Sequence, residues 1–230
     1  GGRHTDPDRE TPPMLFGNFT VAQLLATVIA LLVAFTVHEA MHALVAYRLG
    51  DTTAQRAGRL SLNPAVHLDP MGTLLVLVAG FGWGKPVPVN PWNLRPAGRA
   101  GMGMVAVAGP LSNLLMAFLF AAPFRADMIT REMMGGSALI PGIGQILLSI
   151  VVLNVYLALF NLLPIAPLDG FNVVMGLVPD SWARVLWDTR RYGPVILLVL
   201  VISGRFLRFD LLGATLVPAA NAILRLIIAG

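Results

Sequence analysis

Cysteine is absent from the 230-residue chain, so neither disulfides nor thiolate metal ligands can form. Any bound metal must therefore be held by histidine and carboxylate groups. Charge is also scarce: 12% of the residues are charged, whereas 56% are hydrophobic and the mean hydropathy is +0.74. This composition excludes an ordinary soluble domain and indicates an integral membrane protein, with the lipid bilayer as its surroundings.

Lysine is nearly absent, because fifteen of the sixteen basic residues are arginine. The formal net charge is +4 and the isoelectric point is near 10.3. The arginines are scattered between apolar runs, which fits loops on the cytoplasmic face of a membrane better than a nucleic-acid-binding stripe. Nucleic acid is therefore excluded as a partner.

The sequence is organised around one apolar run that ends in a cluster of ionisable residues. Residues 21–37 carry no charge, and His38, Glu39 and His42 then follow within five positions. Each ionisable group inside a membrane helix costs about 2.5–3.5 kcal/mol on insertion scales, so the cluster needs a compensating partner. On a helix, His38 and His42 share one face and can bind one Zn²⁺, while Glu39 lies beside them and can act on a water molecule at the metal.

This His-Glu-x-x-His spacing is typical of zinc metalloproteases, although it also occurs by chance on solvated helix faces. No solvated face is available here, because the flanking residues are apolar on all sides. A metal is the partner that such a buried cluster requires.

Two histidines leave a catalytic zinc one protein ligand short. Asp169 is the carboxylate that directly follows an apolar helix, and the helix breakers Pro164, Pro167 and Gly170 can turn it inward. Asp169 is therefore the expected third ligand, with an interfacial Asp-Gly turn as the alternative.

Hydropathy predicts an all-α polytopic protein in three parts. The expected parts are a flexible polar tail over residues 1–18, a core over residues 19–175, and a C-terminal part over residues 176–230. Core helices are expected at about 21–47, 102–124 and 142–163, and two further membrane helices at 193–209 and 211–229 after an amphipathic interfacial segment at 179–192.

Residues 51–101 form the least regular region. Residues 52–62 and 86–90 are expected to supply short strands, and the apolar run 71–81 is too short to span and should be re-entrant. His67 and Asp69 lie among prolines, which favours a turn over a metal site. Asn113, in the middle of the second core helix, is expected either to hydrogen-bond between helices or to assist catalysis.

Three motifs occur in order on these helices, and together they resemble the site-2 protease family of intramembrane zinc metalloproteases. The motifs are His38-Glu39-Ala40-Met41-His42, Gly109-Pro110 with Asn113, and Asn161-x-x-Pro164 with Leu168-Asp169-Gly170. The resemblance covers about residues 21–175 and is greatest to the compact bacterial members without an inserted peptide-binding domain. It implies His38, His42 and Asp169 as ligands of one zinc ion, Glu39 as general base, and Asn161 as a group that stabilises the substrate or the intermediate.

The expected function is zinc-dependent hydrolysis of peptide bonds in or near the transmembrane segments of a membrane protein substrate. A metal-binding transporter or sensor, or a membrane protease that acts on soluble or lipidated peptides, is the alternative. His38 and His42 lie in the C-terminal part of the first core helix, and Asp169 follows the C-terminal end of the third. For one zinc to bind all three residues, these two helices must run in the same direction. The positive charge of residues 48–99 then places the metal toward the cytoplasmic side of a prokaryotic cell membrane.

Overall fold

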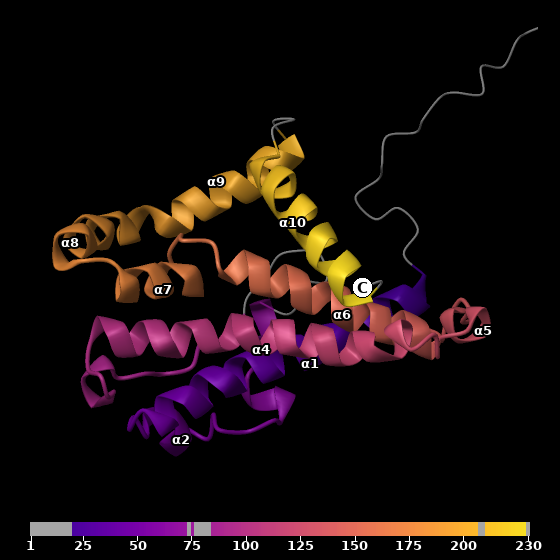
Figure 1. Ribbon diagram of the computed structural model, residues 1–230, viewed down its shortest axis with the longest axis horizontal. Helices are drawn as coiled ribbons and strands as arrows, with labels where there is room; N and C mark the ends of the chain where they lie inside the picture. Colours follow the sequence, from indigo (N-terminus) through magenta and orange to yellow (C-terminus); the bar gives the residue numbers. More distant parts are fainter. Residues whose placement is uncertain (1–19, 73–74, 76–83, 207–209, 229–230) are drawn as a thin grey trace, which may run out of the picture.

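The computed structural model describes residues 20–72, 75, 84–206 and 210–228, and its regular structure in these ranges is helical (Figure 1). The elements are α1 (Val21–Arg48), α2 (Thr53–Arg56), η1 (Pro64–Val66), η2 (Pro91–Asn93), α4 (Arg99–Arg125), α5 (Arg131–Met134), α6 (Ile143–Asn161), α7 (Asp169–Leu177), α8 (Asp180–Thr189), η3 (Arg190–Tyr192), α9 (Gly193–Phe206) and α10 (Leu211–Ile228). The expected all-α class is confirmed. The expected tail over residues 1–18 lies outside the described residues.

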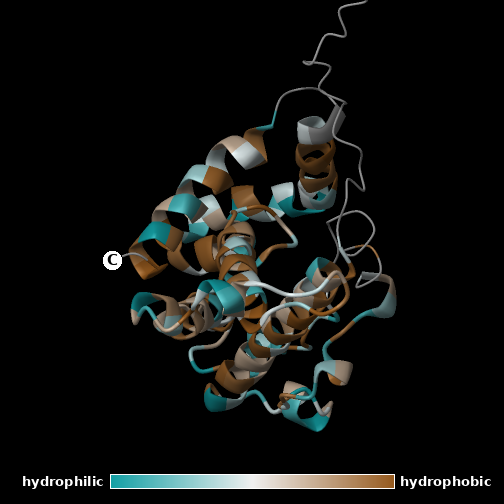
Figure 2. Cartoon of the chain, turned by 90° about the vertical axis from the view of Figure 1, so that its right-hand side faces the viewer, coloured by the Kyte–Doolittle hydropathy of each residue, from teal (hydrophilic) through white to brown (hydrophobic). Residues whose placement is uncertain are grey.

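Within the described ranges, α1, α4, α6 and α10 are long and apolar enough to cross a membrane. Figure 2 shows apolar residues over much of the length of the helices. The outward side chains of α1 and α4 include Leu24, Ile29, Leu115 and Phe118, each more than one third exposed. Such faces suit hydrocarbon, so the chain is a polytopic membrane protein.

The three core helices lie side by side and alternate in direction (Figure 1). At one end of the bundle, the amide of Ala22 donates to the carbonyl of Ala138, in the loop before α6. At the other end, the amide of Arg95, just before α4, donates to the carbonyl of Leu49, just after α1. Thus α1 and α6 run in the same direction and α4 runs against them, as one shared metal requires.

A seam of small residues at every fourth position brings the core helices together. On α1 the buried seam positions are Ala22, Ala26, Ala30, Ala34, His38, His42 and Ala46, and on α4 they are Gly101, Val105, Gly109, Asn113, Ala117 and Ala121. Residues four apart share a helix face, and small side chains let membrane helices approach closely. The two histidines therefore occupy positions that packing has already turned toward α4 and α6.

The strands expected over residues 52–62 are wrong, because one helical turn, α2, stands in their place. The buried carboxylate of Asp51 starts this turn by accepting from the amide and hydroxyl of Thr53, and it also accepts from Asn90 and Asn93. Burial alone would raise the pKa of Asp51, but these hydrogen bonds outweigh burial and lower it. Asp51 thus joins the end of α1 to the chain before α4.

Residues 86–90 do not form a strand in the described structure either. The backbone carbonyls of Lys85 and Pro86 accept hydrogen bonds from the guanidinium of Arg59 instead of from a neighbouring strand. Pro70, Met71, Gly72 and Leu75 are helical, and the remainder of the expected re-entrant run 71–81 lies outside the described residues.

The C-terminal helices α9 and α10 are both present, and α9 is the shorter of the two. Gly193, the first residue of α9, lies against the Ala166 backbone, where an added Cβ would be 2.1 Å from the Ala166 carbonyl oxygen. At the opposite end of the bundle, Arg125 Nη1 donates to the carbonyl of Leu226 in α10, over 3.4 Å. Together the two helices therefore lead from one end of the bundle to the other.

Candidate metal centre

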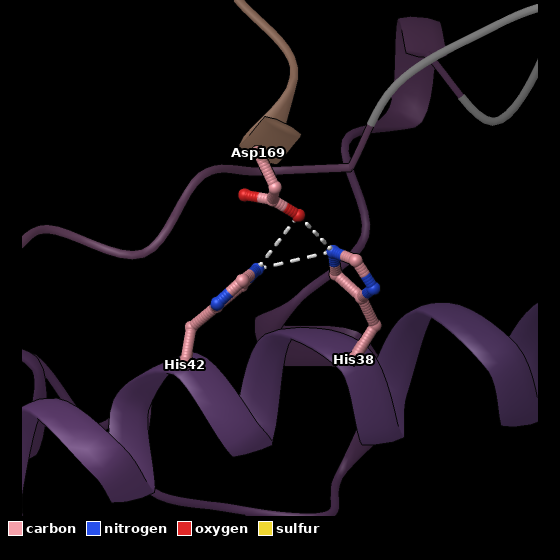
Figure 3. Close-up of side chains that lie close together, drawn as sticks. All are labelled: His38, His42 and Asp169. Carbon is pink, nitrogen blue, oxygen red and sulfur yellow. Dashed lines mark hydrogen bonds and ion pairs between the residues drawn. The ribbon is translucent and has the colours of Figure 1, made fainter. Parts of the chain in front are cut away.

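His38, His42 and Asp169 meet in the interior of the bundle (Figure 3). The two histidines point from α1 toward the carboxylate, which belongs to the first residue of α7. The Oδ2 atom of Asp169 lies 3.0 Å from Nε2 of His38 and 3.3 Å from Nε2 of His42, and the two Nε2 atoms are 3.0 Å apart. Residues 131 positions apart in the sequence thus form one group of three ligand atoms.

Asp169 is held in place by the way α7 docks on α4. Gly170 lies against the end of α6, where a Cβ would be 2.2 Å from the carbonyl oxygen of Leu162. At the other end of α7, Arg99 Nη1 donates to the carbonyls of Met175 and Val178 at 2.8 and 3.2 Å. These hydrogen bonds satisfy terminal carbonyls that a helix leaves unpaired, so α7 is clamped at both ends.

The hydrogen bonds on the far side of each imidazole decide which nitrogen faces the group. Nδ1 of His42 lies 2.8 Å from the carbonyl oxygen of Val105, which can only accept, so this Nδ1 carries a hydrogen. Nδ1 of His38 lies 2.6 Å from Oδ1 of Asn113 and donates in the same way. In the neutral rings, both Nε2 atoms therefore present lone pairs to Asp169.

These residues fit a zinc ion. When both rings are neutral, the three atoms that converge are all acceptors, and Oδ2 of Asp169 is buried without a hydrogen-bond partner. Such a cluster is stabilised by a cation at its centre. Ligands at 2.0–2.1 Å around a tetrahedral ion are about 3.3 Å apart, close to the 3.0, 3.0 and 3.3 Å separations here. The two-histidine, one-carboxylate set is that of a catalytic zinc.

Gly109 on α4 lies against the two imidazole rings of the site. A Cβ at position 109 would lie 2.5 Å from Nε2 of His42 and 2.6 Å from Cε1 of His38, so only glycine leaves room for both rings. Pro110 follows inside the same helix, and its nitrogen has no hydrogen to donate to the preceding turn. Val105, which accepts from His42, lies in that preceding segment.

Glu39 is half-buried and lies on the side of α1 that faces the loop at residue 84. Its Oε1 atom would be 3.5 Å from a Cβ on Gly84, so the glycine passes close beside the carboxylate. The loop is fixed there by the amide of Lys85, which donates to the carbonyl of His67 over 2.8 Å. Glu39 thus lies next to the candidate metal ligands in sequence, and in space it lies beside the loop at residue 84.

The structure does not bring the other candidate residues into the metal group. The Asn161 amide donates to the carbonyl of Leu157 in its own helix over 3.0 Å. Nε2 of His67 donates to the carbonyl of Ser61, and Oδ1 of Asp69 accepts from the amide of Gly72, as expected of a turn. The catalytic role of Asn161 remains a prediction.

Asn154 on α6 is a polar residue of the site that the sequence motifs do not include. It is fully buried and accepts a hydrogen bond from Asn113, which in turn contacts His38. The signal for it is the four-residue seam, since Ile150, Asn154 and Ala158 are all buried on α6. An asparagine in the buried row of one membrane helix is a candidate for a hydrogen bond to a neighbouring helix, here toward the helix that carries the histidines.

Comparison with known proteins agrees with this chemistry. The chain is 43% identical over 190 residues to a Bacillus subtilis (strain 168) protein named "Putative zinc metalloprotease YwhC", over 81% of this chain and 85% of that protein. It is 31% identical to "Putative zinc metalloprotease Rip2" of Mycobacterium tuberculosis, over 75% of this chain and 64% of that protein. It is also 31% identical to "Putative zinc metalloprotease MJ0611" of Methanocaldococcus jannaschii, over 75% of this chain and 78% of that protein. No family model matches the chain. No solved structure is significantly similar to it.

A polytopic helical fold with a buried group of two histidines and one aspartate that can hold a metal ion, together with relatives named as zinc metalloproteases, defines a zinc metalloprotease of the membrane. The three motifs and the identity to the relatives narrow the class further. The chain belongs to the site-2 protease family of zinc metalloproteases.

Proposed function

We propose that the protein is an intramembrane endopeptidase that hydrolyses peptide bonds in or near the transmembrane segments of membrane protein substrates. The burial of the zinc-binding group among apolar helices supports this proposal. His38 and His42 are 4% and 7% exposed, and they lie inside α1, an apolar helix of 28 residues that is long enough to cross a membrane. A peptide bond that reaches such a site must come from within the membrane or be drawn into it.

In this proposal, His38, His42 and Asp169 are the residues that would hold the zinc ion. When bound, zinc polarises the scissile carbonyl and lowers the pKa of a bound water toward about 7. Glu39 accepts a proton from the attacking water and delivers it to the leaving amine, while a C–O bond forms and the C–N bond breaks. The side-chain amide of Asn161 donates one hydrogen to Leu157, and we assign its other hydrogen the role of donating to the substrate carbonyl.

A helical substrate must unwind before attack, because its carbonyls are otherwise tied up in hydrogen bonds. The segment 84–90 is suited to receive the unwound backbone, since it passes beside Glu39 and is held at both ends. Arg59 binds the carbonyls of Lys85 and Pro86, and Asp51 Oδ2 accepts from the amide of Asn90 over 2.7 Å. Pairing of the substrate with this segment would replace the hydrogen bonds that unwinding costs.

The direct test is reconstitution of the purified protein with single-span membrane peptides, with and without a zinc chelator. We expect cleavage within or next to the membrane span, loss of cleavage on chelation, and recovery when zinc is added back. Cleavage that survives chelation would contradict the zinc mechanism. Cleavage only of soluble peptides would contradict the intramembrane assignment while leaving the metalloprotease intact.

The ligand set gives a second expected result. Replacement of His38 or Asp169 by alanine removes one of three converging ligand atoms and should lower zinc affinity by at least about tenfold, since about 1.4 kcal/mol is tenfold in affinity. His67→Ala is the matched control, because His67 is a fully buried histidine outside the group. Zinc content after dialysis, measured by atomic absorption, checks all three variants. Equal loss in His67→Ala would point to a different ligand set.

The proposed orientation places the metal end of the bundle toward the cytoplasm, and the absence of cysteine makes it testable by labelling. Gln55, Trp92 and Ser137 are exposed, and the first two lie at the metal end whereas Ser137 lies at the other. Single cysteines at positions 55 and 92 should be protected from an impermeant reagent in intact cells, and one at 137 should react. Opposite behaviour of positions 55 and 92 would refute the arrangement.

A further inference from the structure

A chain of buried amide hydrogen bonds leads from the metal group into α6. Oδ1 of Asn113 contacts Nδ1 of His38 at 2.6 Å, and Nδ2 of Asn113 donates to Oδ1 of Asn154 at 2.7 Å and to the carbonyl of Ala34 at 3.1 Å. Nδ2 of Asn154 donates to the carbonyl of Ile150 at 2.8 Å. Asn113 and Asn154 are both 0% exposed, so water cannot substitute for any of these partners.

The backbone carbonyls at the end of this series of hydrogen bonds fix the direction of each bond in the series. The carbonyls of Ala34 and Ile150 can only accept, so each must face an amide NH₂ group. Asn154 is thereby forced to turn its oxygen toward Asn113, and Asn113 is forced to turn its own oxygen toward His38. An oxygen in that place requires a hydrogen on Nδ1 of His38, which leaves Nε2 free to bind a metal.

We propose that Asn154 is a positioning residue of the zinc site, acting through Asn113 to hold His38 in the tautomer that presents Nε2 to the metal. The inference rests on the proposed role of His38 as a ligand. Asn113 alone does not secure the orientation, because its amide has two hydrogens and Ala34 accepts only one of them. Without the acceptor on Asn154, a flipped Asn113 would lose one hydrogen bond instead of two and would present its NH₂ group to His38.

A purely structural role for this pair is the weaker account. The seam positions next to Asn113 and Asn154 are filled by glycine, alanine and isoleucine, whose side chains carry no polar group to satisfy. A buried amide adds stability only when all of its partners are in place, and apolar residues of similar shape can replace it at little cost. Two fully buried asparagines that end on a metal-binding histidine therefore point to orientation of that ring, as partners of metal-bound histidines generally do.

Three substitutions on α6 separate orientation from packing. Asn154→Leu keeps most of the volume and removes the acceptor. Asn154→Asp retains it, because an aspartic acid buried in hydrocarbon is neutral and can accept from Asn113 while its O–H donates to Ile150. Val155→Ala is the matched control, since Val155 is also fully buried but packs in a cluster with Val151 and Ala117.

Zinc affinity of each full-length variant in detergent is measured by competition with a chromophoric chelator, and ¹⁵N-histidine NMR of the metal-free protein reports the His38 tautomer. We expect Asn154→Leu to bind zinc about 10–100-fold more weakly and to show hydrogen on Nε2 of His38. Asn154→Asp should retain the parent's affinity and its Nδ1–H signal. Val155→Ala should lower the thermal midpoint and leave the affinity unchanged.

Parent-like affinity in Asn154→Leu, or an equal weakening in Val155→Ala, would overturn the inference. The His38→Ala variant separates this failure from a failure of the ligand proposal. If His38→Ala retains zinc, the ligand set is wrong. If His38→Ala loses zinc while Asn154→Leu matches the parent, only the role of Asn154 falls.

Discussion

Replacing Glu39 by glutamine is expected to abolish measurable proteolysis while leaving one zinc ion per chain. Glutamine has nearly the same shape and remains polar, but it cannot accept the proton of the attacking water. General acid–base catalysis contributes about 10²–10⁴-fold to a rate, so the turnover should fall by that amount. Zinc should remain because none of the three converging ligand atoms belongs to Glu39. The checks are cleavage of a reconstituted single-span peptide and zinc stoichiometry on the same preparation.

This substitution also discriminates between a protease and a metal transporter or sensor. A protein that only binds or moves metal has no use for a proton acceptor beside its ligands, so its activity should survive Glu39→Gln. The matched control is Glu132→Gln, since Glu132 lies on α5, which follows α4 at the opposite end of the bundle from the metal. Metal-dependent transport that persisted in Glu39→Gln, with no cleavage by the parent, would be fatal to the protease assignment.

The parts of the fold that follow from hydropathy could be predicted from the sequence. The helix expected at 21–47 is α1, which begins after the Thr20 capping box with Gln23 and ends before Gly50, whose φ is 101°. The position of the histidine pair on one face follows from helix periodicity alone. Asp169 could be inferred by counting ligands, because few carboxylates in the chain adjoin an apolar helix.

The parts that depend on contacts between distant segments could not be predicted in this way. Residues 52–62 begin with two threonines, which favour a strand by propensity, but the Asp51 side chain accepts hydrogen bonds from Thr53 and starts a helical turn. Gly170 disfavours a helix beginning at Asp169, yet Arg99, distant in sequence, stabilises the end of α7. In both places tertiary hydrogen bonds override local preference.

The polar part of the seam lies between these two cases. The four-residue spacing of small residues is visible in the sequence of α4, where Asn113 falls on it, and on α6 Asn154 lies four residues before Ala158. Which asparagine meets which neighbour depends on the relative shift of the two helices along their axes. That shift is set by packing across the whole interface. The sequence therefore predicts that the two asparagines are buried between helices, but it does not predict which groups they bond to.

The last expected result concerns Gly109, where adding one methyl group should displace zinc. Alanine is favoured over glycine by about 1 kcal/mol inside a helix, so Gly109→Ala should not weaken α4 locally. The new Cβ would nevertheless lie 2.5 Å from Nε2 of His42 and 2.6 Å from Cε1 of His38, which forces both rings out of place. Overpacking of this kind costs about 1–3 kcal/mol, and if the strain is carried by the metal-bound arrangement, zinc affinity falls by about 5–150-fold.

Leu111→Ala provides the control for Gly109→Ala, because Leu111 lies on the same helix but is 54% exposed on the outward face. It should bind zinc as the parent does. Chelator competition measures both variants, and circular dichroism confirms that helix content is retained. Parent-like zinc affinity in Gly109→Ala would show that the imidazoles can move aside and still bind. The close approach of Gly109 to the histidines would then be a consequence of helix packing. The glycine would be needed for the close contact between helices and not for the metal site.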